Sequence, residues 1–365
     1  MTSDKAETHV VLPSINEHQA TIFSVLVKRT YDIRPDGALV RSDITRPFWE
    51  VDEFYEKGDP EWATVKYENE LVPYKTATDL VVVGKAHAPD GLPVREMDVA
   101  VEIGDFRKVI RVIGDRHCCH RDNLPPLFTE PMSFTEMEIR YERAYGGKDF
   151  KSVEGLEFHY PRNPMGTGIA LGNTREVIEG LPLPNLEDPE DLLTPERIVL
   201  DDLWHWNRQP LPQGFCWFQK IWYPRCSFVG SIPGFVEVDE VMREELFGWV
   251  PTKQIALARQ FKLPAFDVRF NNGASPGLVL PALTGDERIL LKGLTPEGEL
   301  AITLPGEAPG MTLDIGLGEN SLPARLQTVL VRMEDMQVDL IWQGVHEYPG
   351  IDWLPEMKRM DVTFY

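Results

Sequence analysis

The chain has 365 residues, which at roughly 100–200 residues per domain suggests two or three units or one large β-rich unit. Its 37 lysines and arginines against 58 aspartates and glutamates give a formal net charge of −21, which argues against nucleic acid or an anionic membrane surface as the main partner, because both would be repelled. The content of 42% hydrophobic residues is that of a folded protein, and 30 prolines with 28 glycines predict many short elements joined by turns.

The first residues lack the basic start and the continuous apolar core of a secretory signal peptide. The apolar runs near Leu80 and Leu278 are far shorter than the roughly 20 residues that span a bilayer. The cysteines do not form a disulfide-rich framework; they are Cys118, Cys119, Cys216 and Cys226. We therefore expect a cytoplasmic protein with free thiols.

The first third of the chain predicts β structure. Ala20 to Ile33 is rich in β-branched and aromatic residues, and an Asp36-Gly37 turn leads into Ala38 to Ile44. A Gly104-Asp105 turn predicts a hairpin. Apolar and polar residues alternate in two of the further strands, which are predicted at Asp79 to Val83, Val94 to Ile103, Phe106 to Ile113 and Phe134 to Arg143.

The middle third predicts a different structure. Gly146 to Pro189 is crowded with Gly, Pro and Asn and reads as long ordered loop. Thr194-Pro195 is a plausible helix start, and further helices are predicted at Asp239 to Gly248 and Thr252 to Phe261.

The last third returns to β structure. Its predicted strands are Phe266 to Phe270, Arg288 to Leu294, Leu300 to Leu304, Arg325 to Arg332 and Gln337 to Gln343, with hairpin turns at Glu297-Gly298 and Glu334-Asp335. The predicted fold is thus mainly β, with sandwich-like sheets and a loop-rich, partly helical middle. We expect a lead-in at 1–21, one unit at 22–344 (β-rich 22–145, loop and helix 146–262, β-rich 263–344) and a tail at 345–365.

Few residues carry a recognisable chemistry. His117-Cys118-Cys119-His120 is a poor metal motif, because neighbouring side chains on a strand point to opposite faces. His87 lies between a strand and a turn and is interpreted as a loop anchor, with a catalytic base as the alternative. The sequence lacks the phosphate loop and the zinc-protease motif. We predict no metal, no cofactor and no catalytic residue.

The densest aromatic stretch runs from Trp204 to Tyr223. Aromatic clusters dominate both cores and interfaces, so both interpretations stay open. The candidate partner-binding residues in this stretch are Trp204, Trp206, Trp217 and Trp222.

Several blocks resemble the motifs of one bacterial family, in the family's order. The most specific is Pro73 to Arg116, and the others are Val25 to Leu39, Glu138 to Gly147, Asn163 to Gly168, Leu183 to Pro189, Phe266 to Pro276, Leu283 to Gly298 and Leu326 to Gly344. On these motifs the chain resembles the type VI secretion-associated family catalogued as a domain of unknown function (DUF2169), found beside genes for VgrG spike and PAAR tip proteins. It departs from the family at Gln327, where Asp is common, and at Gln343, where Arg is common.

The resemblance implies a non-enzymatic adaptor or chaperone that binds a secretion effector and helps load it onto the VgrG/PAAR spike in the cytoplasm. The net charge then suggests a basic partner surface, with 175–202 as the most acidic stretch. The motif residues are expected to hold the scaffold; they are His87, Asp115, Arg116, Glu142, Arg143, Gly146, Gly147, Asn163, Gly166 and Gly168. The alternatives are a hydrolase with a scattered site around His87 and carboxylates, or a structural component of the secretion apparatus.

Overall fold

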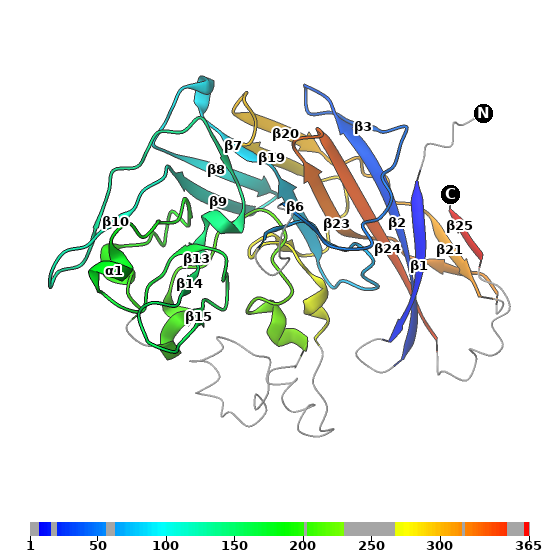
Figure 1. The fold of residues 1–365 in the computed structure, drawn as a ribbon. Coiled ribbons are helices and arrows are strands. Elements are labelled where there is room, and N and C mark those ends of the chain that lie inside the picture. The colour runs from blue at the N-terminus through cyan, green and yellow to red at the C-terminus, as the bar shows by residue number, and fades with distance from the viewer. Residues whose placement is uncertain are drawn as a thin grey trace.

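The computed structural model describes residues 7–15, 20–55, 63–200, 203–229, 267–315, 318–348 and 361–364. Most of the regular structure in these ranges is β, which confirms the predicted class (Figure 1). Within the same ranges, no helix is both long enough and apolar enough to cross a bilayer.

The larger sheet has seven strands and is built around two long ones. β2 (Thr21–Ile33) pairs antiparallel with β24 (Gln337–Tyr348), and both are rich in the β-branched and aromatic residues that suit a buried pleated surface. β6 and β23 run parallel, so the sheet is mixed. Its order is β1 (Thr8–Ile15), β2, β24, β23 (Arg325–Arg332), β6 (Thr78–Val83) and β18 (Val279–Leu280), with β3 (Leu39–Arg41) also paired with β2.

The second sheet has five strands and contains two of the predicted hairpins. Gly104, in the turn between β8 and β9, has a φ of +53°, which glycine adopts without steric cost. The turn at Glu297-Gly298 likewise joins β19 to β20. The order is β17 (Leu186–Glu187), β9 (Phe106–Ile113), β8 (Glu96–Ile103), β19 (Arg288–Lys292) and β20 (Glu299–Thr303).

The two sheets share one hydrophobic core, as a sandwich-like arrangement requires (Figure 1). Leu80 and Leu330 from the first sheet belong to the same buried cluster as Val101 and Leu291 from the second. Another buried cluster joins part of β2, including Val25, to a three-stranded sheet of β22 (Asn320–Leu322), β21 (Met311–Asp314) and β25 (Asp361–Phe364). The segments predicted as lead-in and tail therefore contribute β1 and β25.

The middle of the chain is loop-rich, but the predicted helical content there is not supported. In the described part of 146–262, the only α-helix is the single turn α1 (Arg175–Ile178). Thr194-Pro195 begins only the short 3-10 helix η4 (Pro195–Arg197), and the Thr194 side chain makes no capping hydrogen bond. The helices predicted at Asp239 to Gly248 and Thr252 to Phe261 lie outside the described residues.

Short elements complete the fold. Those of the middle segment gather beside β9, away from β1 (Figure 1). The paired strands are β4 (Glu53–Phe54) with β5 (Val65–Tyr67), β7 (Lys85–His87) with β12 (Glu136–Glu138), β10 (Cys118–Cys119) with β11 (Leu127–Phe128), β13 (Tyr145–Gly146) with β16 (Thr167–Gly168), and β14 (Lys148–Asp149) with β15 (Phe158–His159). The other 3-10 helices are η2 (Pro89–Gly91), η3 (Tyr141–Arg143), η5 (Leu203–Arg208), η6 (Arg225–Val229) and η8 (Val268–Asn271).

Two predicted strands are wrong in their backbone. From Phe134 to Arg143 the predicted alternation of buried side chains holds, but the chain leaves the sheet after Glu138 and turns into η3. At Phe266 to Phe270 the described residues form η8, because the Asp267 side chain accepts a hydrogen bond from the backbone N–H of Arg269 and caps a helical turn.

Candidate functional site

Asn163 ties together two motif segments that are distant in sequence. β13 and β16 pair in parallel, which brings the segment after Tyr141 onto the loop around Asn163. Asn163 is fully buried, and its Nδ2 donates to the carbonyl oxygens of Tyr141 at 2.8 Å and Tyr145 at 3.1 Å. The Tyr141 carbonyl oxygen also accepts from the backbone N–H of Ala144 at 3.1 Å, so the amide of Asn163 links the loop to the turn η3.

The motif glycines allow the same two segments to approach closely. A Cβ on Gly146 would lie 2.1 Å from the Asn163 carbonyl oxygen, and a Cβ on Gly166 would lie 2.5 Å from Asn163 Nδ2. Gly147 and Gly168 have φ values of +113° and +101°, a region that other residues rarely adopt. The contacts of these residues are therefore structural.

Glu142 and Arg143 hold two further junctions. Glu142 accepts a hydrogen bond from the backbone N–H of Thr64 at 2.9 Å. Arg143 Nη1 lies 3.5 Å from Asp115 Oδ1 and donates to Asn185 Oδ1 at 3.1 Å. Both residues lie in the 3-10 turn η3, outside the strand predicted to continue to Arg143.

The segment from Arg116 to His120 is also structural. Arg116 pairs with the buried carboxylate of Glu187, and the backbone N–H of His120 donates to Glu179 Oε2 at 3.0 Å. Burial raises the pKa of the Cys118 thiol to about 12, so it is not a thiolate at neutral pH. Among the described residues, no three His, Cys, Asp or Glu side chains are grouped so that they could hold a metal ion.

The aromatic stretch lies mainly in the core. Trp217 and Trp222 are only 2% and 1% exposed, and the Trp222 ring packs edge-to-face on Tyr141 at 5.1 Å. The partner-binding role predicted for Trp217 and Trp222 does not fit this burial, because large aromatic side chains that fill a core cannot contact a partner. Trp206 is partly buried, and the side chain of Trp204 lies outside the described residues, so for these two the role stays a prediction.

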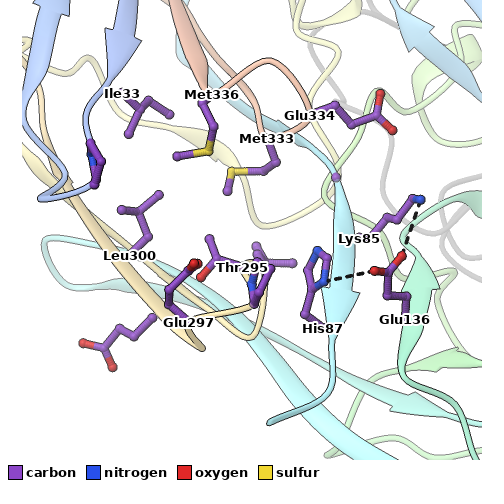
Figure 2. A pocket seen from close by; sticks show the side chains of 15 residues that line it. Ile33, Lys85, His87, Glu136, Thr295, Glu297, Leu300, Met333, Glu334 and Met336 are labelled. Carbon is purple, nitrogen blue, oxygen red and sulfur yellow. Dashed lines mark ion pairs between the residues drawn. The ribbon is translucent and has the colours of Figure 1, made fainter. Parts of the chain in front are cut away.

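An open cavity of about 600 Å³ lies where hairpin ends of the two sheets meet (Figure 2). We call it the Met333 cavity. Its lining comes from the β2–β3, β19–β20 and β23–β24 turns and from β7 and β12: Ile33, Pro35, Gly84, Lys85, His87, Glu136, Leu294, Thr295, Pro296, Glu297, Glu299, Leu300, Met333, Glu334 and Met336.

One side of the Met333 cavity is apolar. Figure 2 shows Ile33, Leu300, Met333 and Met336 around this side, with His87 and Glu136 opposite. Ile33, Leu300 and Met333 belong to the main core cluster, so the cavity is an open end of that core. Methionine side chains are flexible and polarizable, and adaptable protein-binding surfaces use them often.

The rim of the Met333 cavity is acidic. Glu136 lies 3.6 Å from Lys85 Nζ and 3.7 Å from His87 Nδ1, and Glu334 is paired with a lysine outside the cavity. In the part of the chain that the structure describes, Glu297 and Glu299 have no Lys or Arg within 4.0 Å. The cavity therefore combines apolar contact area with a surplus of negative charge.

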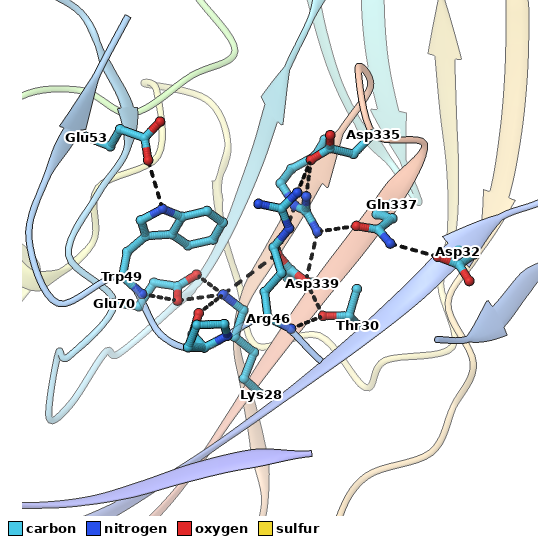
Figure 3. A network of polar contacts seen from close by, with 12 residues as sticks. Lys28, Thr30, Asp32, Arg46, Trp49, Glu53, Glu70, Asp335, Gln337 and Asp339 are labelled. Carbon is cyan, nitrogen blue, oxygen red and sulfur yellow. Dashed lines mark hydrogen bonds and ion pairs between the residues drawn. The ribbon is translucent and has the colours of Figure 1, made fainter. Parts of the chain in front are cut away.

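A buried charge network fixes the hairpin that carries the methionines (Figure 3). Arg332 is 1% exposed; its Nε lies 3.0 Å from Asp339 Oδ2, its Nη2 donates to Gln337 Oε1 at 2.7 Å, and its Nη1 pairs with Asp335. These bonds lie at the turn end of the β23–β24 hairpin, where Arg332 and Gln337 are the last paired residues. They hold the hairpin tip, and with it the wall of the Met333 cavity, in place.

Lys28 completes the same network from β2. Its Nζ lies 2.7 and 2.9 Å from the two carboxylate oxygens of Glu70 and 3.7 Å from Asp339 Oδ2, and it sits 4.1 Å from the centre of the Trp49 ring. Burial raises the pKa of Glu70 to about 7, because the loss of water outweighs the attraction of Lys28. Each buried cation, Lys28 and Arg332, thus faces a buried acid.

The two departures from the family pattern lie side by side. Gln327 and Gln343 are 1% and 2% exposed, and Gln327 Nε2 lies 3.3 Å from Gln343 Oε1. Gln327 also donates to the Val72 carbonyl at 2.8 Å, and Gln343 donates to the Lys75 carbonyl at 2.8 Å. A neutral amide pair therefore occupies a position where the family pattern suggests Asp beside Arg.

His87 is placed in the Met333 cavity without the partner that hydrolysis needs. β7 pairs with β12 so that His87 faces Glu136, at a distance too long for a hydrogen bond. Among the described residues, no serine, threonine or cysteine lies within hydrogen-bond distance of the His87 ring; Thr295, in the same cavity, has a hydroxyl without any hydrogen-bond partner. The nucleophile–base pair of the hydrolase alternative is therefore not assembled at His87.

Sequence reasoning missed the Met333 cavity as a site. Its residues come from turns that are far apart in the chain, and periodicity predicts the strands but not which turns meet. A signal was available: Met333 and Met336 flank the predicted Glu334-Asp335 turn, where polar residues are usual. Two methionines at a hairpin tip are a reason to look for a contact surface.

The comparisons with known proteins give a family and no closer relative. A family model described as "Uncharacterized protein conserved in bacteria (DUF2169)" matches residues 18–343. No curated protein and no solved structure matches the chain.

Proposed function

Since the chain belongs to the uncharacterized bacterial family DUF2169, we propose that it is a non-enzymatic adaptor or chaperone that binds a type VI secretion effector and helps load it onto the VgrG/PAAR spike. The motif resemblance supplies the secretion context and the expected place of action, the cytoplasm of the producing cell. The Met333 cavity is the observation that supports an adaptor role.

The chemistry of the Met333 cavity indicates what the partner offers. Its volume of about 600 Å³ lies within the roughly 300–1,000 Å³ of ligand pockets, so it takes a few anchor side chains rather than a folded domain. The apolar side suits leucine, methionine or phenylalanine. The unpaired carboxylates of Glu297 and Glu299 suit flanking lysine or arginine. We therefore assign to this cavity a short basic, amphipathic segment of the effector.

A capture experiment with matched variants tests the proposal. Tagged wild-type chain, expressed in a bacterium with an active type VI system, is expected to retain an effector, a PAAR protein or VgrG, identified by mass spectrometry. Met336→Glu puts a charge into the cavity and should abolish the capture. Leu127→Glu changes an exposed leucine on β11, remote from the cavity lining, and should leave it intact.

The same experiment can contradict the proposal. Retention of no effector, PAAR protein or VgrG under secreting conditions would count against the adaptor role itself. Equal capture by the Met336→Glu and Leu127→Glu variants would leave the adaptor role standing and would remove the Met333 cavity as its site.

A further inference from the structure

Lys108 is a lysine on the inward face of a core strand. Ile110 and Val112 of β9 belong to the main core cluster, and because side chains alternate along a strand, Lys108 shares their face. Its Nζ donates to Ser275 Oγ at 2.7 Å and to the Pro276 carbonyl oxygen at 2.6 Å. No carboxylate of the described residues lies within 4.0 Å of this amine.

The acceptor beneath Lys108 is rigid. Ser275 is fully buried, and the hydroxyl of Tyr141 donates to the same Oγ at 2.9 Å. The Tyr141 ring is itself fixed edge-to-face against Trp222. Lys108 Nζ is therefore held at a defined position rather than free to follow solvent.

The environment of Lys108 favours a neutral amine. Lys108 is half-buried, and the loss of water around its amine lowers its pKa to about 7, against the weaker attraction of Asp188. A neutral amine has two N–H donors and one lone pair. Ser275 and Pro276 occupy both donors, so the lone pair is left for the open side. A desolvated lysine of this kind is a nucleophile toward carbonyl carbon.

A second cavity of about 600 Å³, which we call the Lys108 cavity, opens on this amine. Gln213, which lines it, is 6% exposed; its Nε2 donates to the Leu211 carbonyl, whereas its Oε1 has no hydrogen-bond donor among the described residues. Asp188 and Glu190 also line the cavity, and no Lys or Arg in the described ranges pairs with either. The other charged lining residues are paired, Arg107 with Glu102 and Asp98 with Arg111. The cavity thus offers an amine, a free carbonyl acceptor and two carboxylates without a cationic partner.

From this arrangement we infer that the Lys108 cavity binds a small, positively charged aldehyde or ketone, which Lys108 holds as an imine. Nζ attacks the carbonyl carbon, a C=N bond replaces the C=O bond, and the oxygen leaves as water with the two protons of Nζ. Asp188 and Glu190 neutralise the ligand's charge, and the carbonyl oxygen of Gln213 adds a partial negative charge to the same cavity. This site is separate from the Met333 cavity and does not depend on the adaptor role.

The test uses three aldehydes of similar size and different charge: betaine aldehyde (cationic), propionaldehyde (neutral) and glyoxylate (anionic). Purified full-length chain is treated with each at pH 8, the imine is trapped with borohydride, and the modified lysines are mapped by peptide mass spectrometry. We expect a principal adduct on Lys108, formed most readily with the cationic probe and least with the anionic one.

The expected selectivity follows from protonation. At pH 8 the neutral fraction of an amine with a pKa of about 7 is ~230 times that of an ordinary lysine at about 10.4. A less basic amine is also a weaker nucleophile, which lowers the rate constant of the neutral amine ~30-fold if the dependence on basicity known for thiols applies. Lys108 should therefore react about tenfold faster than an exposed lysine of ordinary pKa. The rate at Lys108 should reach half its maximum near pH 7.

Two variants complete the design. Asp188→Asn with Glu190→Gln should remove the preference for betaine aldehyde and leave labelling by propionaldehyde. Lys108→Met should abolish the principal adduct, and peptide mapping of the wild type gives the same answer if this variant does not fold. Labelling that follows lysine exposure, with Lys108 unmodified, would overturn the inference, and so would equal labelling of Lys108 by all three probes.

Discussion

Replacing Lys28 by methionine should destabilise the protein strongly. The side chains of Lys28 and Glu70 are 0% and 2% exposed and lie 2.7 Å apart. Without Lys28, Glu70 keeps only the Trp49 backbone N–H, at 3.0 Å, as a donor. Removing one partner of a buried pair costs about 3–5 kcal/mol, because the other charge stays buried and unpaired. Glu70→Met should cost somewhat less, since Lys28 keeps Asp339 at 3.7 Å.

The double replacement should be milder than the sum of the single ones. Methionine at both positions fills the space without leaving a charge, and Asp339 keeps its partner Arg332. Buried pairs exchanged for apolar residues are often near neutral in stability, so the coupling energy should approach the sum of the two single costs, about 5 kcal/mol or more.

The assay is urea unfolding followed by tryptophan fluorescence at pH 8, for the wild type, both single variants and the double variant. A control cycle on Arg175 and Glu179, whose side chains are 65% and 49% exposed, should give a coupling below about 0.5 kcal/mol. If the costs of the Lys28 and Glu70 replacements simply add, so that their coupling energy is no larger than that of the control cycle, the two charges do not depend on each other.

Three further changes test other parts of the structure. Gly146→Ala should cost more than about 3 kcal/mol in urea unfolding, because its Cβ meets a backbone oxygen at 2.1 Å, whereas Gly155→Ala, with φ of +77° and nothing within 4 Å, should cost about 1 kcal/mol. Folding raises the pKa of the Glu70 carboxyl from 4.5 to about 7, so the stability that its protonation contributes is lost as the pH rises through 7. The free energy of unfolding of the wild type, measured relative to that of Glu70→Gln, should therefore fall by up to about 3 kcal/mol from pH 5 to pH 8. A difference that grows with pH would contradict this. Gln327→Asp and Gln343→Arg should each lower the free energy of unfolding by about 3 kcal/mol or more, measured by thermal and urea unfolding. The double variant should recover most of this loss, because the two new charges lie side by side. No recovery would mean that the two positions do not couple.

Local patterns predicted the strands well and the backbone between them less well. The burial of Met137, Ile139 and Tyr141 follows the predicted alternation, yet only the first of them lies in a strand. Alternation reports which side chains face the core. It does not report whether a neighbouring strand is present to pair with, and after Glu138 no strand pairs with this segment in the described chain.

The candidate site could not be predicted for a different reason. Ile33, His87, Leu300 and Met333 each lie at the end or turn of a predictable strand, but their meeting depends on how the sheets stack. The number of acidic residues in the sequence does not locate the site either, because only tertiary contacts distinguish the carboxylates without a cationic partner from those that form ion pairs. Lys108 shows the same limit: the alternation of β9 places it inward, but the residues beneath it come from distant loops.

Site-specific photo-crosslinking is the most direct test of the Met333 cavity as a partner site. A photoreactive phenylalanine analogue is placed at Met336, at the hairpin tip, or at Leu127 as the control, in bacteria with an active type VI system. Irradiation should join the Met336 variant to an effector or to a PAAR or VgrG protein, whereas the Leu127 variant should stay unjoined. Crosslinks to such a protein from Leu127 and none from Met336 would contradict this expectation.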